Sequence, residues 1–133
     1  MFTFLIISDF DRIAENVYQV FTEIGTPRYE TNGRLLIESS TGMAGGWIAF
    51  QPIENIQDDY EMDELAAIKG RIRNPSFFLI EGRDGEDKFS TAFIRKFCPP
   101  GRVLIDNDHG VIADLVEIKE RIESGTNWLY LSS

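Results

Sequence analysis

The sequence is poor in the residues that form disulfides and metal centres, since its 133 residues include one cysteine, Cys98, and one histidine, His109. A single cysteine excludes an internal disulfide and suits a reducing compartment. We expect Cys98 to be a buried structural thiol. The chain also lacks the HxH, HExxH and CxxC patterns, so it carries no strong metal signature.

Long apolar runs are absent as well, because no run approaches the roughly 20 residues that a membrane-spanning helix needs. The apolar start "MFTFLIISDF" has neither the basic n-region nor the small-residue cleavage site of a signal peptide, and its apolar run ends at Ser8 and Asp9. We therefore interpret it as a first strand, and we expect a soluble protein without a membrane partner.

Positive charge is scarce: 13 Lys and Arg face 22 Asp and Glu, which gives a formal net charge of -9. Proteins that bind a nucleic-acid backbone neutralise its phosphates with Lys and Arg, so a uniformly acidic surface works against such binding. Nucleic acid and anionic membrane are therefore unfavourable partners, whereas a basic protein is a favourable one.

Motifs for nucleophilic catalysis and for nucleotide binding are missing too, since the chain has no GxSxG elbow, no Walker loop and no GxGxxG fingerprint. No segment indicates a cofactor. These absences predict a protein that is not an enzyme and that needs no cofactor or metal.

The segment closest to a catalytic signature is "RVLIDNDHGVIAD", which places Asp106 and Asp108 beside His109. Two carboxylates and an imidazole could hold a divalent metal in a small hydrolase. The same letters also describe two short apolar runs joined by the turn-forming residues of "NDHG". We favour the hairpin, and the hydrolase remains the alternative.

The hydrophobic pattern places the first helix after the strand Phe2 to Ile7, with Ser8 as its expected N-cap and Asp11 three residues on. Gly25 is a suitable stop for this helix. One face of it carries the apolar residues Ile13, Val17, Val20, Phe21 and Ile24.

The remaining elements follow from similar patterns. "GRLLIESS" and "GGWIAFQPI" predict two strands joined by a Gly-containing connection, and "PSFFLIEG" predicts a buried strand. A helix is expected from Asp58, one from Asp114 to Gly125, and a final strand in "NWLYLS". Two stripes at helical spacing are expected in the core, namely Leu65, Ile68 and Ile72 and then Phe89, Phe93 and Phe97.

This order of elements is not the strict alternation that a doubly wound parallel sheet requires. It predicts an α+β fold with a mixed, mainly antiparallel sheet and three to four packed helices. We find no repeat and no linker long enough to divide the chain, so residues 1–133 are expected to form a single domain.

Carboxylates are concentrated in three places. The segment "ENIQDDYEMDE" contains six acids without one Lys or Arg, the loop "EGRDGED" contains a second group, and the hairpin turn supplies the last two. If these groups converge, they form a surface that mimics the charge of a phosphate backbone and attracts a cationic protein. The predicted partner-binding residues are Glu54, Asp58, Asp59, Glu61, Asp63, Glu64, Asp84, Glu86, Asp87, Asp106 and Asp108.

In its size, acidity, α+β organisation and lack of catalytic motifs, the whole chain resembles the small single-domain immunity proteins that bacteria make beside contact-dependent inhibition and other polymorphic toxins. The resemblance implies a cytoplasmic inhibitor, a monomer or weak homodimer, that binds one cognate toxin domain. Such a toxin is commonly a basic nuclease, and its active site would be masked. An acidic adaptor domain is the other alternative that the sequence leaves open.

Overall fold

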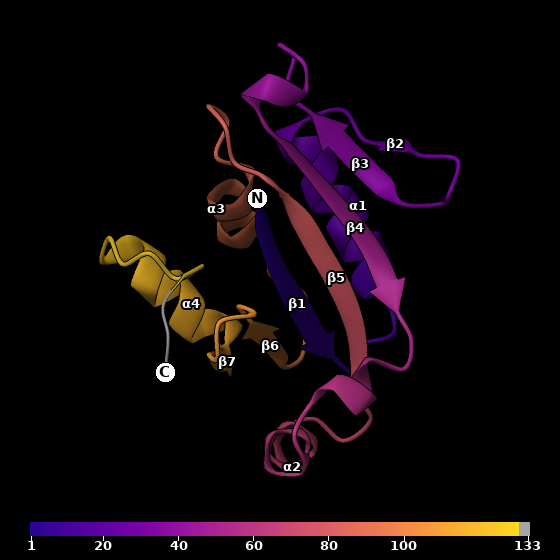
Figure 1. Cartoon of the computed structure of the whole chain (residues 1–133), viewed down its shortest axis with the longest axis vertical. Helices are drawn as coiled ribbons and strands as arrows, with labels where there is room; N and C mark the ends of the chain where they lie inside the picture. The colour runs from indigo at the N-terminus through magenta and orange to yellow at the C-terminus, as the bar shows by residue number, and fades with distance from the viewer. Residues whose placement is uncertain (131–133) are drawn as a thin grey trace.

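A computed structural model describes residues 1–130, which form one seven-stranded sheet and four α-helices (Figure 1). This confirms the predicted α+β class. The strands are β1 (Phe2–Ser8), β2 (Arg28–Tyr29), β3 (Leu35–Glu38), β4 (Trp47–Ile53), β5 (Ser76–Arg83), β6 (Val103–Asp106) and β7 (Ile112–Asp114). The helices are α1 (Ile13–Ile24), α2 (Met62–Arg71), α3 (Phe89–Lys96) and α4 (Leu115–Glu123), with short 3-10 helices η1 (Met43–Gly45) and η2 (Ile56–Asp59).

The strand order across the sheet is β2-β3-β4-β5-β1-β6-β7, and every neighbouring pair in the described chain is antiparallel. The N-terminal strand β1 lies between β5 and β6, with Leu5 opposite Leu79 on one side and Asp106 on the other. Strand β1 thus joins the β2–β5 half of the sheet to the β6–β7 hairpin.

The two faces of the sheet differ because side chains alternate along each strand. Phe4 and Ile6 point to the face where α1, α3 and α4 pack, and both are fully buried in the larger apolar cluster. Ile7 points to the opposite face, where a smaller cluster gathers it with Ile68 of α2 and Leu104 of β6. Helix α2 covers only one end of this second face (Figure 1).

The two stripes expected in the core are largely confirmed. Phe89, Phe93 and Phe97 are 3%, 0% and 0% exposed, and the apolar face of α1 is buried apart from half-buried Ile24. The second stripe is buried at Ile68 and Ile72, whereas the rest of α2 is mostly exposed.

Two predicted helix starts are wrong. Ser8 does not cap α1: its hydroxyl is buried, donates to the Arg102 carbonyl at 3.1 Å and accepts from the Phe10 amide, so it ties β1 to the segment before β6. Helix α1 begins at Ile13 instead. Helix α2 begins at Met62 rather than at Asp58, because residues 56–59 form the 3-10 turn η2.

Two further predictions are corrected near the end of the chain. Cys98 is exposed rather than buried, since it follows the last core residue of the Phe stripe. The predicted final strand is wrong for residues 127–130, which contain a turn at residues 128–129 and no strand, and its last two residues lie outside the described chain. Gly125 does end α4: its φ is positive, at 80°, and its backbone amide donates a hydrogen bond to the Ile122 carbonyl.

None of the described helices is long and apolar enough to cross a membrane.

Candidate protein-binding surface

The β6–β7 hairpin turn is built by Asn107, whose side chain is fully buried. Its Oδ1 atom accepts from the backbone amides of His109 at 2.9 Å and Val111 at 3.1 Å, and its Nδ2 atom donates to the Trp128 carbonyl at 2.9 Å. Asp108 adopts a left-handed conformation with a φ of 63°, which Asp tolerates better than most residues. The hairpin prediction for this segment is therefore confirmed.

His109 is exposed in this turn, and its ring meets the Tyr130 ring edge-on at a centroid distance of 5.3 Å. Asp106 is the last residue of β6 and is buried, and its two carboxylate oxygens accept from the Tyr60 hydroxyl and from the Asp108 amide. Within residues 1–130, no group of three His, Cys, Asp or Glu side chains is placed to hold a metal ion. Turn formation alone accounts for the arrangement of Asp106, Asp108 and His109.

Tyr60 connects two of the three predicted acidic groups. It lies between η2 and α2, and its hydroxyl donates to Asp106 Oδ2 at 2.6 Å although the two residues are 46 positions apart. The ring packs against Phe77 at a centroid distance of 5.7 Å and contacts the smaller apolar cluster. The segment "ENIQDDYEMDE" is thereby fixed next to the hairpin turn.

Burial and the nearby carboxylates raise the pKa of Tyr60 far above its usual value. Partial burial is the largest cause, and the hydrogen bond to Asp106 is the next. The negative charges of Asp106, Glu64 and Asp108 add to the effect. We call the surface around Tyr60 the Tyr60 acidic surface. It consists of Glu54, Asp58, Asp59, Glu61, Asp63, Glu64, Asp106 and Asp108.

The carboxylates of the Tyr60 acidic surface make none of the ion pairs found in the described chain. A few of them serve local structure: Glu64 accepts from the Glu61 amide at 3.2 Å, and Asp63 accepts from the Glu64 amide at 2.9 Å, as acids at a helix start do. Asp58 and Asp59 are exposed, and their carboxylates contact no hydrogen-bond or ion-pair partner within residues 1–130. No direct ion pair within residues 1–130 therefore neutralises the negative charge of this surface.

The second acidic group lies elsewhere. Asp84 accepts from the amide and the hydroxyl of Ser90, both at 2.8 Å, so its carboxylate holds the first turn of α3. Glu86 and Asp87 are exposed in the loop after β5. This loop and α2 are at opposite ends of β5 (Figure 1), and eight extended residues separate them by about 23 Å. The three groups therefore do not converge, and only the first and third form one surface.

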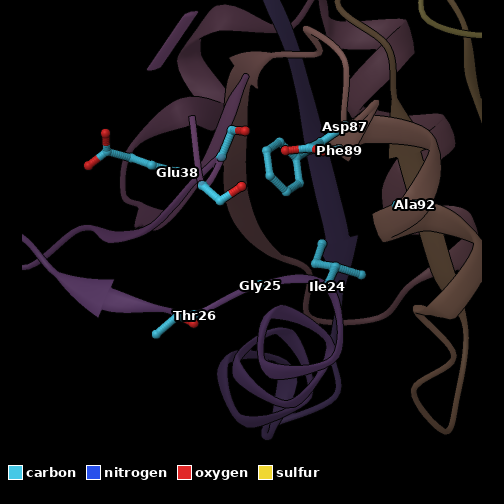
Figure 2. Close-up of a pocket in the computed structure, with 9 residues that line it drawn as sticks. Ile24, Gly25, Thr26, Glu38, Asp87, Phe89 and Ala92 are labelled. Atoms are coloured by element: carbon cyan, nitrogen blue, oxygen red, sulfur yellow. The ribbon is translucent and has the colours of Figure 1, made fainter. Parts of the chain in front are cut away.

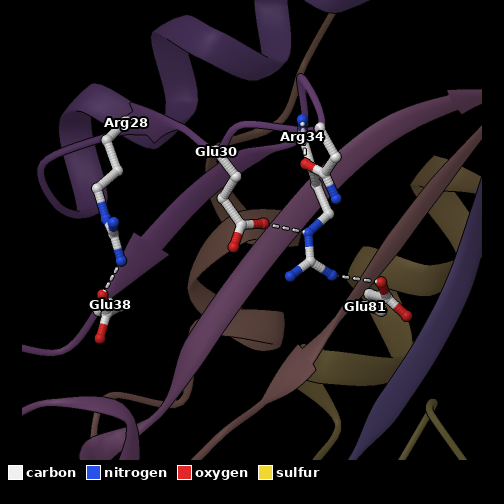
Figure 3. Close-up of polar contacts among 6 residues, drawn as sticks. Arg28, Glu30, Arg34, Glu38 and Glu81 are labelled. Atoms are coloured by element: carbon white, nitrogen blue, oxygen red, sulfur yellow. Dashed lines mark hydrogen bonds and ion pairs between the residues drawn. The ribbon is translucent and has the colours of Figure 1, made fainter.

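Acids on the uncovered part of the second sheet face are neutralised, in contrast to the Tyr60 acidic surface. Arg34 donates to Glu30 at 2.5 Å and to Glu81 at 2.6 Å, and Arg28 pairs with Glu38 (Figure 3). The guanidinium of Arg34 also lies 5.4 Å from the centre of the Trp47 ring, a cation–π geometry. Sequence reasoning missed this network, because its partners are up to 47 positions apart and depend on the strand order.

The Arg34 network shifts the pKa values of its members. The hydrogen bond from Arg34 lowers the pKa of Glu30, and the same bond raises the pKa of Arg34. At the far edge of the sheet, the bidentate bond from Arg102 lowers the pKa of Asp114. Asp114 was predicted to begin α4, and it does occupy the position before Leu115, although its side chain is committed to Arg102.

A hollow of about 470 Å³ opens between the end of α1 and the start of α3, remote from Tyr60 (Figure 2). Its lining combines apolar Ile24 and Phe89 with hydroxyl groups and two carboxylates. Figure 2 shows the Glu38 carboxylate turned away from the Phe89 ring, and this carboxylate pairs with Arg28. The hollow therefore lacks the convergent charged groups that a typical ligand site provides.

Comparison of the chain with protein-family models, with curated proteins and with solved structures gave no match.

Proposed function

We propose that this protein is an immunity protein that binds a cognate basic toxin domain in the cytoplasm and masks its active site. The observation that carries the proposal is the Tyr60–Asp106 hydrogen bond, which holds the acidic segment "ENIQDDYEMDE" next to Asp106 and Asp108 of the hairpin. None of these carboxylates makes an ion pair within residues 1–130. Uncompensated charge of one sign attracts a partner of the opposite sign and raises the association rate.

Met62 gives this surface an apolar contact. It is the first residue of α2, it stands among the acids of "EMDE", and its side chain is 90% exposed. Interfaces typically combine an apolar centre with a polar rim, and methionine is enriched in them. An exposed Met within an acidic rim therefore favours a protein partner over a purely solvated face.

Masking follows from the chemistry of the partner class. The cleft of a nuclease binds phosphates with Lys and Arg, so a rigid array of carboxylates competes for the same cations. A toxin of this kind would bind the Tyr60 acidic surface in place of its substrate.

The test is a charge reversal at three acids that support no described contact. The variant Glu54→Lys/Asp58→Lys/Asp59→Lys should fold normally, because all three side chains are exposed and lie before the first turn of α2. Its association rate with the cognate toxin should fall by about tenfold or more at low salt, since steering is lost and like charges meet. Stopped-flow measurements across a salt series give this rate.

A matched control reverses the same number of charges at the opposite end of the sheet. The variant Glu23→Lys/Glu86→Lys/Asp87→Lys has the same net charge as the test variant, and its three positions are also exposed. It should associate faster than the test variant at every salt concentration. A slower control would place the interface at the loop after β5, and equal, salt-independent rates for wild type and both variants would reject steering by either surface.

A further inference from the structure

A groove lies between α2 and the β6–β7 hairpin, and we call it the α2–β7 groove. Its volume is about 220 Å³. Ile68, Leu104 and Ile112 form its apolar floor, and Glu64, Arg71 and Gly110 form its walls. Because Ile112 is directly opposite Asp106 in the sheet, the floor of the groove borders the Tyr60 acidic surface.

The size of the groove selects the kind of group that fits. An apolar cavity of about 150 Å³ is large enough for benzene, whereas pockets for small-molecule ligands usually measure about 300–1,000 Å³. A groove of about 220 Å³ is thus suited to one ring-sized or leucine-sized side chain. A side chain of this kind, inserted from a partner surface, is a typical binding hot spot.

The charged residues that line the groove determine which partner residues can lie beside the inserted side chain. Glu64 lines the groove from the first turn of α2, four positions after Tyr60. The Tyr60 hydroxyl and the Asp108 amide both bind the Asp106 carboxylate, so Asp108 is near this end of the groove. Arg71 belongs to the same helix, two turns after Glu64, and lies toward Asp114, which pairs with the floor residue Leu104 in the sheet. Glu64, Asp106 and Asp108 make no ion pair within residues 1–130, so the end of the groove at Glu64 is acidic.

We propose that the α2–β7 groove receives one large apolar side chain, Phe or Leu, from a loop of the basic partner, with a Lys or Arg beside it that meets Glu64 and Asp108. This inference rests on the proposed function and names the anchor that the acidic surface surrounds. The apolar anchor fixes the bound position, and the adjacent acids steer the partner toward it.

The groove can be tested without the toxin, using short peptides as probes. Acetyl-Gly-Lys-Phe-Lys-Gly-amide should shift the methyl NMR signals of Ile68, Leu104 and Ile112 in a saturable manner. Acetyl-Gly-Lys-Ala-Lys-Gly-amide has the same charge without the anchor, so it should leave these methyl signals in place. Equal shifts from both peptides, or no shift from either, would overturn the inference.

A filled groove provides the second test. Ala67 is exposed on α2 and lines the groove, so Ala67→Phe should occupy it with an internal ring, while the neighbouring exposed residue gives the control Ala66→Phe. We expect Ala67→Phe to weaken the Phe peptide by about tenfold or more, which is about 1.4 kcal/mol, and Ala66→Phe to change its affinity less than twofold. Similar affinities for the two variants would contradict the inference.

Ala67→Phe and the Lys reversals together separate this inference from the proposed function. If Ala67→Phe binds the cognate toxin like wild type while the Lys reversals slow association, the groove is not the anchor site and the proposed function stands. If the Phe peptide binds the groove but the Lys reversals leave toxin association unchanged, steering of a basic toxin fails and the groove remains a peptide-binding site.

Discussion

Replacing Tyr60 by Phe should destabilise the protein and loosen its acidic surface, because the change removes one oxygen and leaves the ring. The ring would keep its packing against Phe77, so the lost interaction is the 2.6 Å bond to Asp106. Asp106 is 8% exposed, and its Oδ2 atom has no other recorded donor among the described residues. A hydrogen bond to a charged group contributes about 1.5–3 kcal/mol to the free energy of unfolding. Because Tyr60→Phe leaves a buried carboxylate oxygen without a donor, we expect its cost to be near the upper end of this range.

That loss is a large fraction of the roughly 5–15 kcal/mol that stabilises a domain of ordinary size. Urea unfolding followed by Trp fluorescence measures it, and Tyr18→Phe is the matched control because Tyr18 is 42% exposed on α1. The control should stay within about 0.5 kcal/mol of wild type. If Tyr60→Phe also stays within that limit, the hydrogen bond does not hold the two acidic segments together, and the observation behind the proposed function is lost.

The raised pKa of Tyr60 extends the same prediction to pH. A tyrosine whose pKa is higher in the folded state keeps its proton there while the unfolded chain releases it, so the resulting stability is present below about pH 10 and is lost as the pH rises above that value. Wild type should therefore lose stability more steeply than Tyr60→Phe above about pH 10. Parallel stability curves for the two proteins in this range would contradict the assigned environment of Tyr60.

The other predictions concern the core and the turn. Phe93→Ala should lower the free energy of unfolding by about 3–5 kcal/mol, measured by heat or urea, because Phe93 is fully buried and its ring centroid lies within 6.2 Å of those of Phe4, Phe21 and Phe97. An almost unchanged stability would mean that the stripe tolerates a cavity. His109→Asn should fold normally and keep toxin protection within a few-fold, since the turn is held by Asn107 and Asn tolerates turn conformations; a folded but inactive variant would instead support the hydrolase.

Local periodicity was sufficient for the parts of the fold that depend on neighbours in the chain. The four-residue spacing of Phe89, Phe93 and Phe97 predicted a buried stripe, and the turn letters of "NDHG" predicted the β6–β7 hairpin. Both signals work because burial of one helix face, or closure of a two-strand turn, involves residues within about ten positions.

The parts that failed depend on long-range contacts. The start of α2 is one case, since the helix was expected from Asp58 but Tyr60 is held by Asp106 of the distant β6–β7 hairpin. The chain leads to Tyr60 through Asn55, which has a left-handed conformation, and through the turn η2. The role of Ser8 is another, since its hydroxyl binds a carbonyl 94 positions away. No pattern within a short window encodes such a partner.

The candidate site shows the same division. Acid-rich segments are visible in the sequence, yet whether they meet depends on the strand order, which inserts β1 between β5 and β6. That order brings Asp106 to Tyr60 and leaves Glu86 and Asp87 at the far end of β5. The α2–β7 groove has no sequence signature at all, because Ile68, Leu104 and Ile112 come from separate elements.

The Tyr60 acidic surface should destabilise the free protein and favour association with a cationic partner, so salt should have opposite effects on stability and on binding. Its unpaired carboxylates repel one another in the free protein and attract a cationic partner, and salt screens both effects as the Debye length falls from about 10 Å at 0.1 M to about 3 Å at 1 M. Raising NaCl over this range should therefore stabilise the free protein while it slows toxin association. Each Asp or Glu to Lys change raises the net charge by two, so Glu54→Lys/Asp58→Lys/Asp59→Lys moves the net charge from -9 to -3. This variant should gain less stability from salt than wild type. If the stability of the wild type stays constant or falls as NaCl rises, the clustered carboxylates do not destabilise the free protein by repulsion. Attraction of a cationic partner would then not be needed to explain why these carboxylates are grouped.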